Sequence, residues 1–211
     1  MARVTRPADP AAPLVLAITG ASGAPYGIRL LEQLLVAGRE IQLIVSSHGF
    51  RLLRTESDVG DLAGLRAAVG AERFDRLVMV YDDGDRGAKP ASGSALAGGM
   101  VICPCSMGTV ASIAAGTSRS LVERAADVAL KERRPLLLVT RETPLSLIHL
   151  ENMRRVTMAG ATVMPAAPGF YHRPESIADL VDFLVARALD HLGVPNTLAP
   201  RWGESDTGEP A

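Results

Sequence analysis

The sequence has little of several features that mark whole classes of protein. Of its 211 residues two are cysteines and 4% are aromatic, and the formal net charge is -1. So few cysteines exclude a disulfide framework, and a nearly neutral chain poor in aromatic rings lacks the usual means of binding nucleic acid or an anionic membrane surface. No apolar run approaches the roughly 20 residues of a membrane-spanning helix. We therefore expect a cytoplasmic protein that binds neither nucleic acid nor membrane.

The two cysteines, Cys103 and Cys105, stand on either side of Pro104 at the end of an apolar run. A disulfide between residues so close in a strand is strained. A metal site needs more ligands than two thiols, and the four histidines lie far apart in the sequence. We predict two reduced, buried thiols and no bound metal.

The composition and length suit one folded domain. Hydrophobic residues make up 47% of the chain and charged residues 21%, which is ordinary for a protein with a well-covered core. We place this α/β domain at residues 13–194. Residues 1–12 are rich in proline and are expected to form a disordered lead-in, and residues 195–211 are expected to form a C-terminal arm or tail.

Short apolar runs alternate with amphipathic stretches along the whole domain. Strands are expected at residues 14–19, 41–45, 77–81, 100–103, 136–140 and 161–164. Helices are expected from Pro25 to Gly38, across residues 49–75, across residues 120–133, and from starts at Thr143-Pro144 and at Pro174. This alternation predicts a single doubly wound, mainly parallel sheet of the Rossmann-like or flavodoxin-like kind. Such sheets bind ligands beyond the carboxyl ends of their strands.

Three of the segments that follow strands suit a phosphorylated ligand. Gly20-Ala-Ser-Gly-Ala24 combines small residues with a helix start, and Cys105-Ser-Met-Gly-Thr109 combines a hydroxyl, a glycine and a second helix start. Either could equally be a tight turn without a ligand. Ser46-Ser47, after the second strand, can contact a cofactor or cap the next helix.

Charged residues follow the strand at 136–140. Arg141 can bind a planar anionic group through paired hydrogen bonds, and Glu142 can act as a general acid or base; an ordinary exposed ion pair is the alternative. The charged run at residues 131–134 is by default a solvated helix end.

Taken in order, these stretches resemble the flavin prenyltransferases of the UbiX type. The resemblance runs from about residue 14 to residue 193. Its most specific part is residues 124–135, continued by Arg141-Glu-Thr-Pro144 and His149-Leu150 and completed by residues 20–24 and 168–174. It implies a metal-free enzyme that transfers a dimethylallyl group from dimethylallyl phosphate to N5 and C6 of reduced FMN. The prenyl-FMN would serve a UbiD-type decarboxylase, and the enzyme would be a homododecamer with sites at its subunit contacts.

The resemblance also implies roles for individual residues. The residues expected to bind FMN are Gly20, Ala21, Ser22, Ser46, Ser106, Met107, Gly108, Thr109 and Arg141. Those expected around the prenyl donor are Ser92, Gly93, Lys131, Tyr171, Arg187 and Trp202. Ser22, Glu56, Lys131 and Glu142 are the expected catalytic residues. The choice between a monophosphate and a diphosphate donor, the subunit that supplies each contact and the role of the loop at 82–90 stay open.

Two alternatives come from other classes of protein. FMN-dependent cysteine decarboxylases such as phosphopantothenoylcysteine decarboxylase carry Pro-Ala-Ser-Ala-Asn-Thr where this chain has Pro104-Cys-Ser-Met-Gly-Thr109, and they use a histidine before that strand. This chain has no histidine between Gly49 and Ile148. A non-catalytic flavin carrier is the second alternative, and it would have no need of a second phosphate site. Both considerations favour the transferase.

Overall fold

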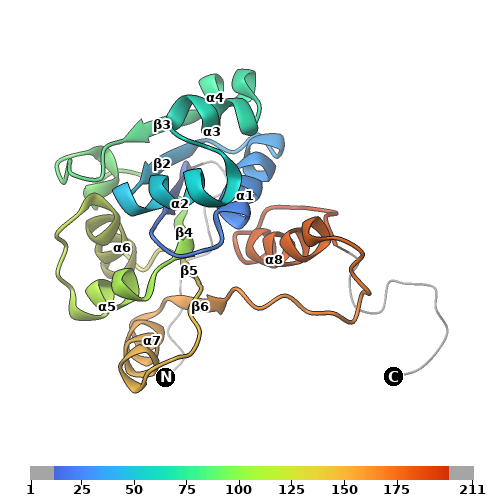
Figure 1. Cartoon of the computed structure of the whole chain (residues 1–211). Helices are drawn as coiled ribbons and strands as arrows, with labels where there is room; N and C mark the ends of the chain where they lie inside the picture. Colours follow the sequence, from blue (N-terminus) through green and yellow to red (C-terminus); the bar gives the residue numbers. More distant parts are fainter. Residues whose placement is uncertain (1–11, 200–211) are drawn as a thin grey trace.

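The computed structural model describes residues 12–199, so the predicted lead-in, most of the predicted C-terminal arm and Trp202 lie largely or wholly outside it. Six parallel strands form one sheet in the order β3-β2-β1-β4-β5-β6 (Figure 1). The strands are β1 (Leu14–Ile18), β2 (Ile41–Val45), β3 (Val78–Tyr81), β4 (Gly99–Cys105), β5 (Leu136–Thr140) and β6 (Thr162–Pro165). The prediction of a doubly wound parallel sheet is confirmed.

The apolar runs form strands here because helices cover both faces of the sheet. The four central strands are buried along their whole length, whereas the edge strands β3 and β6 are partly exposed. The helices are α1 (Ala24–Val36), α2 (Ser47–Ser57), α3 (Leu62–Ala68), α4 (Ala71–Leu77), η1 (Lys89–Ala91), α5 (Met107–Ala115), α6 (Leu121–Lys131), α7 (Leu147–Ala159) and α8 (Ile177–His191).

Alternate residues of β1 point into two separate cores. Leu14, Leu16 and Ile18 pack with α1 and α8, whereas Val15 and Ala17 pack with α5 and α6. Figure 1 shows these two pairs of helices on opposite sides of the sheet. Residues of α6 and residues of α8 are therefore separated by the full thickness of the sheet.

Two helices begin later than the sequence predicts. Ser146 caps α7 and Ser176 caps α8, so the predicted starts at Thr143-Pro144 and at Pro174 are wrong. Each serine accepts a hydrogen bond from the third residue of its helix, whose side chain in turn accepts from the serine N–H. This reciprocal cap outweighs the preference of proline for a first turn. His149 is the partner of Ser146 in the cap of α7.

The strand β4 includes both cysteines and Pro104. The ladder between β4 and β5 shifts between Ile102 and Cys105, which is where a strand can hold a proline without losing a regular hydrogen bond. Both thiols are free and buried, as predicted, and burial raises the pKa of Cys103 to about 12. Within residues 12–199 no helix is both long and apolar enough to cross a membrane.

Candidate functional site

The residues predicted to contact FMN lie together at the carboxyl ends of the strands, and we call this end of the sheet the FMN edge. Ser46 follows β2, the turn at 20–22 follows β1, the turn at 106–109 follows β4, and Arg141 follows β5. These strands are neighbours in the order β2-β1-β4-β5. The connections leave β1 and β4 in opposite directions, so this edge contains the switch point at which doubly wound sheets bind ligands.

Hydrogen bonds fix the turns relative to one another. The Thr19 hydroxyl donates to the Pro104 carbonyl (2.9 Å) and accepts from the Ser106 N–H (2.9 Å). Arg141 Nε donates to the Ser22 carbonyl (3.2 Å). Three consecutive strands are thus tied at their carboxyl ends. Sequence reasoning missed Thr19, although a hydroxyl that ends a buried strand beside a glycine turn is a usable signal.

Two of the predicted FMN residues are helix caps. Ser46 Oγ accepts from the Gly49 N–H of α2 (3.0 Å), and Ser106 Oγ accepts from the Thr109 N–H of α5 (3.1 Å). The capping interpretation of Ser46 is therefore correct, and a ligand at this edge would meet the first turns of both helices. A side-chain carbon at Gly20 would lie 2.6 Å from the Cβ of His48, so glycine is what lets the β1 turn adjoin α2 this closely.

The side chain of Glu56, a residue of α2, binds the main chain at the start of α1. Its Oε2 accepts from the main-chain N–H groups of Gly23 and Ala24, both at 2.8 Å. We expected the start of this helix to offer its N–H groups to a phosphate. For these two groups that expectation is wrong, because a carboxylate of the same chain already satisfies them. Glu56 comes from α2, 33 residues along the chain from Gly23, and nothing local in the sequence indicates the pairing.

The environment of Glu56 favours its charged form. Burial alone would raise the pKa of this carboxyl, but the N–H groups of Gly23 and Ala24, the Ser22 hydroxyl and the positive charge of Arg141 together lower it below the ordinary value of 4.5. Ser22, Glu56 and Arg141 are thus one electrostatic unit at the FMN edge.

Replacing Glu56 with Gln is expected to lower the free energy of unfolding of the flavin-free protein by about 1–2 kcal/mol at pH 7, because two charge-assisted hydrogen bonds become neutral ones. The folded-state pKa is depressed, so the contribution is complete above the ordinary pKa of 4.5 and is lost as the pH falls through the lower folded value. Thermal unfolding at pH 7 and pH 3 should show the two proteins converging at low pH. The exposed Glu40→Gln is the control, and an unchanged difference at both pH values would contradict the assignment.

Gly93 and Lys131 also lie together, but at the end of the sheet opposite to the FMN edge. A side-chain carbon at Gly93 would lie 2.5 Å from Lys131 Nζ, and Arg134 donates to the Gly93 carbonyl (2.7 Å). Gly93 precedes β4, and Lys131 ends the helix that leads into β5. Because all strands are parallel, this pair lies at the amino ends of the strands, whereas Arg141 lies at their carboxyl ends. Ser92 is beside it and shares a hydrogen bond with Ser94 (2.9 Å).

Tyr171 and Arg187 lie on the face opposite to α6. The Tyr171 ring contacts Phe183 of α8 edge-on, with centroids 5.6 Å apart, and Arg187 of α8 pairs with Asp190 (3.4 Å). One chain therefore does not bring Lys131 and Arg187 to the same place. Glu142 is exposed beside Arg141, where its carboxylate accepts from the Thr143 N–H (3.1 Å).

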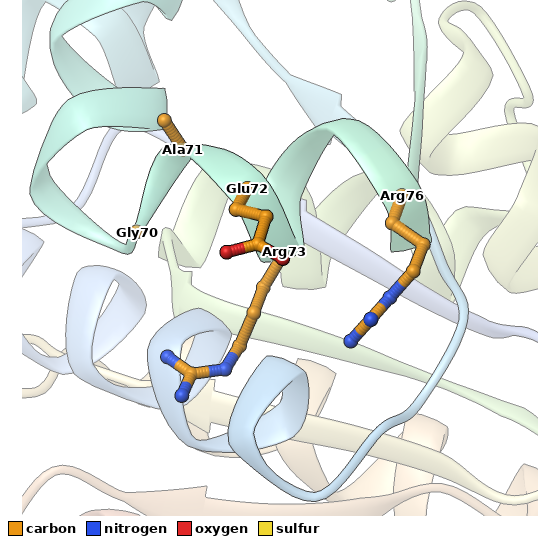
Figure 2. A pocket seen from close by; sticks show the side chains of 5 residues that line it. All are labelled: Gly70, Ala71, Glu72, Arg73 and Arg76. Carbon is orange, nitrogen blue, oxygen red and sulfur yellow. The ribbon is translucent and has the colours of Figure 1, made fainter.

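A hollow of about 430 Å³ opens at α4, away from all of these residues. It is lined by Gly70, Ala71, Glu72, Arg73 and Arg76 (Figure 2). None of the predicted site residues lines it, and its helix precedes the edge strand β3, so we assign it no part in the site. Across the described part of the chain, no three histidine, cysteine or acidic side chains are grouped as a metal site would require.

The sequence matches one protein family model and is similar to several known proteins. Residues 3–189 match the family model described as Flavoprotein. The chain is 50% identical over 198 residues to flavin prenyltransferase UbiX of Pseudomonas aeruginosa, covering 90% of this chain and 94% of that protein. It is 44% identical over 206 residues to flavin prenyltransferase UbiX of Synechocystis sp., covering 94% and 100%.

Solved structures of UbiX-type proteins are also similar to this chain in fold and in sequence. The crystal structure of AnUbiX (PadA1) in complex with FMN and dimethylallyl pyrophosphate has a TM-score of 0.84 at 41% identity and covers 91% of this chain and 97% of its own. A dodecameric FMN-dependent UbiX-like decarboxylase from Escherichia coli O157:H7 has a TM-score of 0.82 at 39% identity, covering 90% and 98%. The FMN-dependent cysteine decarboxylase TvaF, at 15% identity and a TM-score of 0.57, shares the fold alone.

Proposed function

The chain belongs to the flavoprotein family and, within it, to the flavin prenyltransferases of the UbiX type, and from this premise we propose that it joins a dimethylallyl group from dimethylallyl phosphate to N5 and C6 of reduced FMN. The observation that carries the proposal is the group of turns at the carboxyl ends of β2, β1, β4 and β5, with Arg141 hydrogen-bonded across to the β1 turn. AnUbiX, 41% identical, was crystallised with FMN and dimethylallyl pyrophosphate.

The residues at this edge fit FMN. The turn at 20–22 presents main chain with little side chain, and it adjoins the first turn of α2, where Ser46 is the cap. We expect the FMN phosphate between these two turns, because the N–H groups of Gly23 and Ala24 are held by Glu56. The flavin ring would then extend toward residues 106–109 and Arg141.

The prenyl site is proposed to need more than one copy of the chain. Gly93 and Lys131 lie at the amino ends of the strands, whereas the FMN edge is at the carboxyl ends, so a single chain cannot supply both to one substrate. The E. coli relative is described as dodecameric. We propose that this chain also forms a homododecamer, in which Lys131 of one copy reaches the FMN edge of another.

The proposed roles follow from the chemistry of phosphate departure. Lys131 and Arg187 neutralise the phosphate, and Tyr171 donates a hydrogen bond to it, as the bond between its oxygen and the dimethylallyl carbon breaks with the electron pair leaving on oxygen. Glu142 donates a proton to the departing phosphate, and Ser22, beside Glu56, relays protons near the flavin. Reduced FMN would supply the nucleophilic N5, which takes the place of the phosphate oxygen on the dimethylallyl carbon. The bond to C6 would then form at the dimethylallyl double bond, which gains one proton while C6 loses one.

We further propose that residues 13–194 form the FMN-binding domain and that the prenyl-FMN is passed to a UbiD-type decarboxylase. Both extend the family assignment. The first rests on the continuous sheet and its covering helices, and the second on the similarity to flavin prenyltransferases of the UbiX type.

The direct test is the mass of the flavin product. Anaerobic incubation of the purified protein with reduced FMN and dimethylallyl phosphate is expected to yield a flavin heavier by one C5 unit, detected by mass spectrometry. A parallel reaction with dimethylallyl diphosphate decides which donor is used. Recovery of unmodified FMN alone, with both substrates shown to be bound, would overturn the proposed activity.

A further inference from the structure

The carboxylate of Glu132 lies where the proposed prenyl site has its lysine and its glycine. Glu132 is the residue after Lys131, at the carboxyl end of α6, and Lys131 Nζ donates to its Oε1. We propose that, in the free protein, this carboxylate stands in for the phosphate of the prenyl donor, and that its displacement sets the affinity for that substrate. The inference rests on the proposed function, since it concerns the phosphate site of the same reaction.

The space at Gly93 is what admits the carboxylate. A side-chain carbon at position 93 would overlap Glu132 Oε1 and would lie 2.5 Å from Lys131 Nζ. Arg134, two residues after Glu132, donates to the Gly93 carbonyl (2.7 Å) and thereby fixes the Gly93 main chain. A side-chain-free notch with a fixed wall and an ammonium group is thus filled by an anion of the same chain.

A carboxylate and a phosphate present the same chemistry to this notch. Both offer negatively charged oxygens that only accept hydrogen bonds, and both are bound most strongly by cationic donors. Two such anions cannot share one ammonium group at short range without repulsion. The phosphate must therefore move the Glu132 carboxylate away from Lys131 Nζ when it binds.

The ion pair is suited to being displaced. In a single copy of the chain the Lys131 and Glu132 side chains keep 46% and 38% of their surface exposed, and pairs this accessible to water are weak. Glu132 would consequently change substrate affinity by a small factor while keeping Lys131 neutralised and oriented when the site is empty. Glu132 acts through Lys131 and is a positioning residue.

Glu132→Gln removes the competing charge and nearly preserves the shape of the side chain. In the FMN-loaded, fully assembled protein we expect the KM for dimethylallyl phosphate to fall about two- to fivefold while kcat stays within about twofold. Inorganic phosphate, measured by calorimetry as a ligand without turnover, should bind more tightly by the same factor. Asp75→Asn is the matched control, because it removes one carboxylate on α4 from an exposed pair with Arg66 of α3.

The outcomes separate this inference from the proposed function. Tighter phosphate binding without any prenylated flavin would support the stand-in role and count against the transferase. An unchanged or weaker affinity for both phosphate and the prenyl donor, in Glu132→Gln and in Glu132→Ala alike, would overturn the stand-in role and leave the transferase untouched. A KM change of the same size in Asp75→Asn would also overturn it, because the change in net charge alone would then explain the lower KM.

Discussion

Two variants that are each inactive alone, Lys131→Ala and Arg187→Ala, are expected to recover about a quarter of the wild-type prenyl-transfer activity when they are co-assembled. Lys131 ends α6 and Arg187 lies on α8, and these helices cover opposite faces of the sheet. If a site takes these residues from two different copies, random mixing gives both intact residues in about one site of four. The measurement is the rate of prenyl-FMN formation by oligomers purified through two different affinity tags.

The control for this experiment mixes two changes from the same half of the site. Gly93 and Lys131 are adjacent within one chain, so Gly93→Val mixed with Lys131→Ala should recover no activity. Each copy would then carry one defective member of the pair wherever it is placed. Failure of the first mixture to recover, with hetero-oligomers demonstrated, would mean that Lys131 and Arg187 serve one site from the same chain.

Glu142→Gln is expected to keep FMN bound and to slow prenyl transfer by about 10²- to 10⁴-fold. The Glu142 side chain is exposed at the FMN edge, and the oxygen that accepts from the Thr143 N–H (3.1 Å) can be replaced by the amide oxygen of glutamine. Geometry is thus kept while the proton is lost. Single-turnover formation of the prenylated flavin measures the transfer step, and flavin fluorescence measures FMN affinity.

An exposed glutamate outside the site supplies the comparison for Glu142. Glu151→Gln on α7 changes the net charge by the same amount and removes only an i,i+3 pair with Arg154 (3.7 Å). It should leave the transfer rate unaltered. Full activity in Glu142→Gln would exclude this carboxyl from proton donation, whereas loss of FMN would assign it to cofactor binding.

The sheet was predictable because apolar runs such as residues 14–18 and 41–45 can be buried on both faces only as central strands. The position of Lys131 was predictable in principle as well: a residue that ends a helix leading into a parallel strand must lie at the amino edge. The start of α7 was mispredicted because the Thr143-Pro144 signal competed with the reciprocal cap of Ser146 and His149.

What could not be predicted are the contacts between segments far apart in the sequence. Glu56 reaches the start of α1, and Arg141 reaches the Ser22 carbonyl, 119 residues away. Neither contact has a local pattern, since each depends on how tightly the β1 turn packs against α2 and on the neighbouring position of β5. The residue types were therefore recognised, whereas their electrostatic grouping follows only from the fold.

The buried cysteines have a consequence for the redox chemistry of an assay mixture. Burial raises the pKa of Cys103 and that of Cys105 beside it, so the reactive thiolate form of both sulfurs is strongly disfavoured at neutral pH. Neither sulfur is then a practical electron donor or a target for alkylating reagents while the protein stays folded. Since these are the only cysteines in the chain, changes in absorbance during turnover can be attributed to the flavin, and reductants can be chosen for the flavin alone.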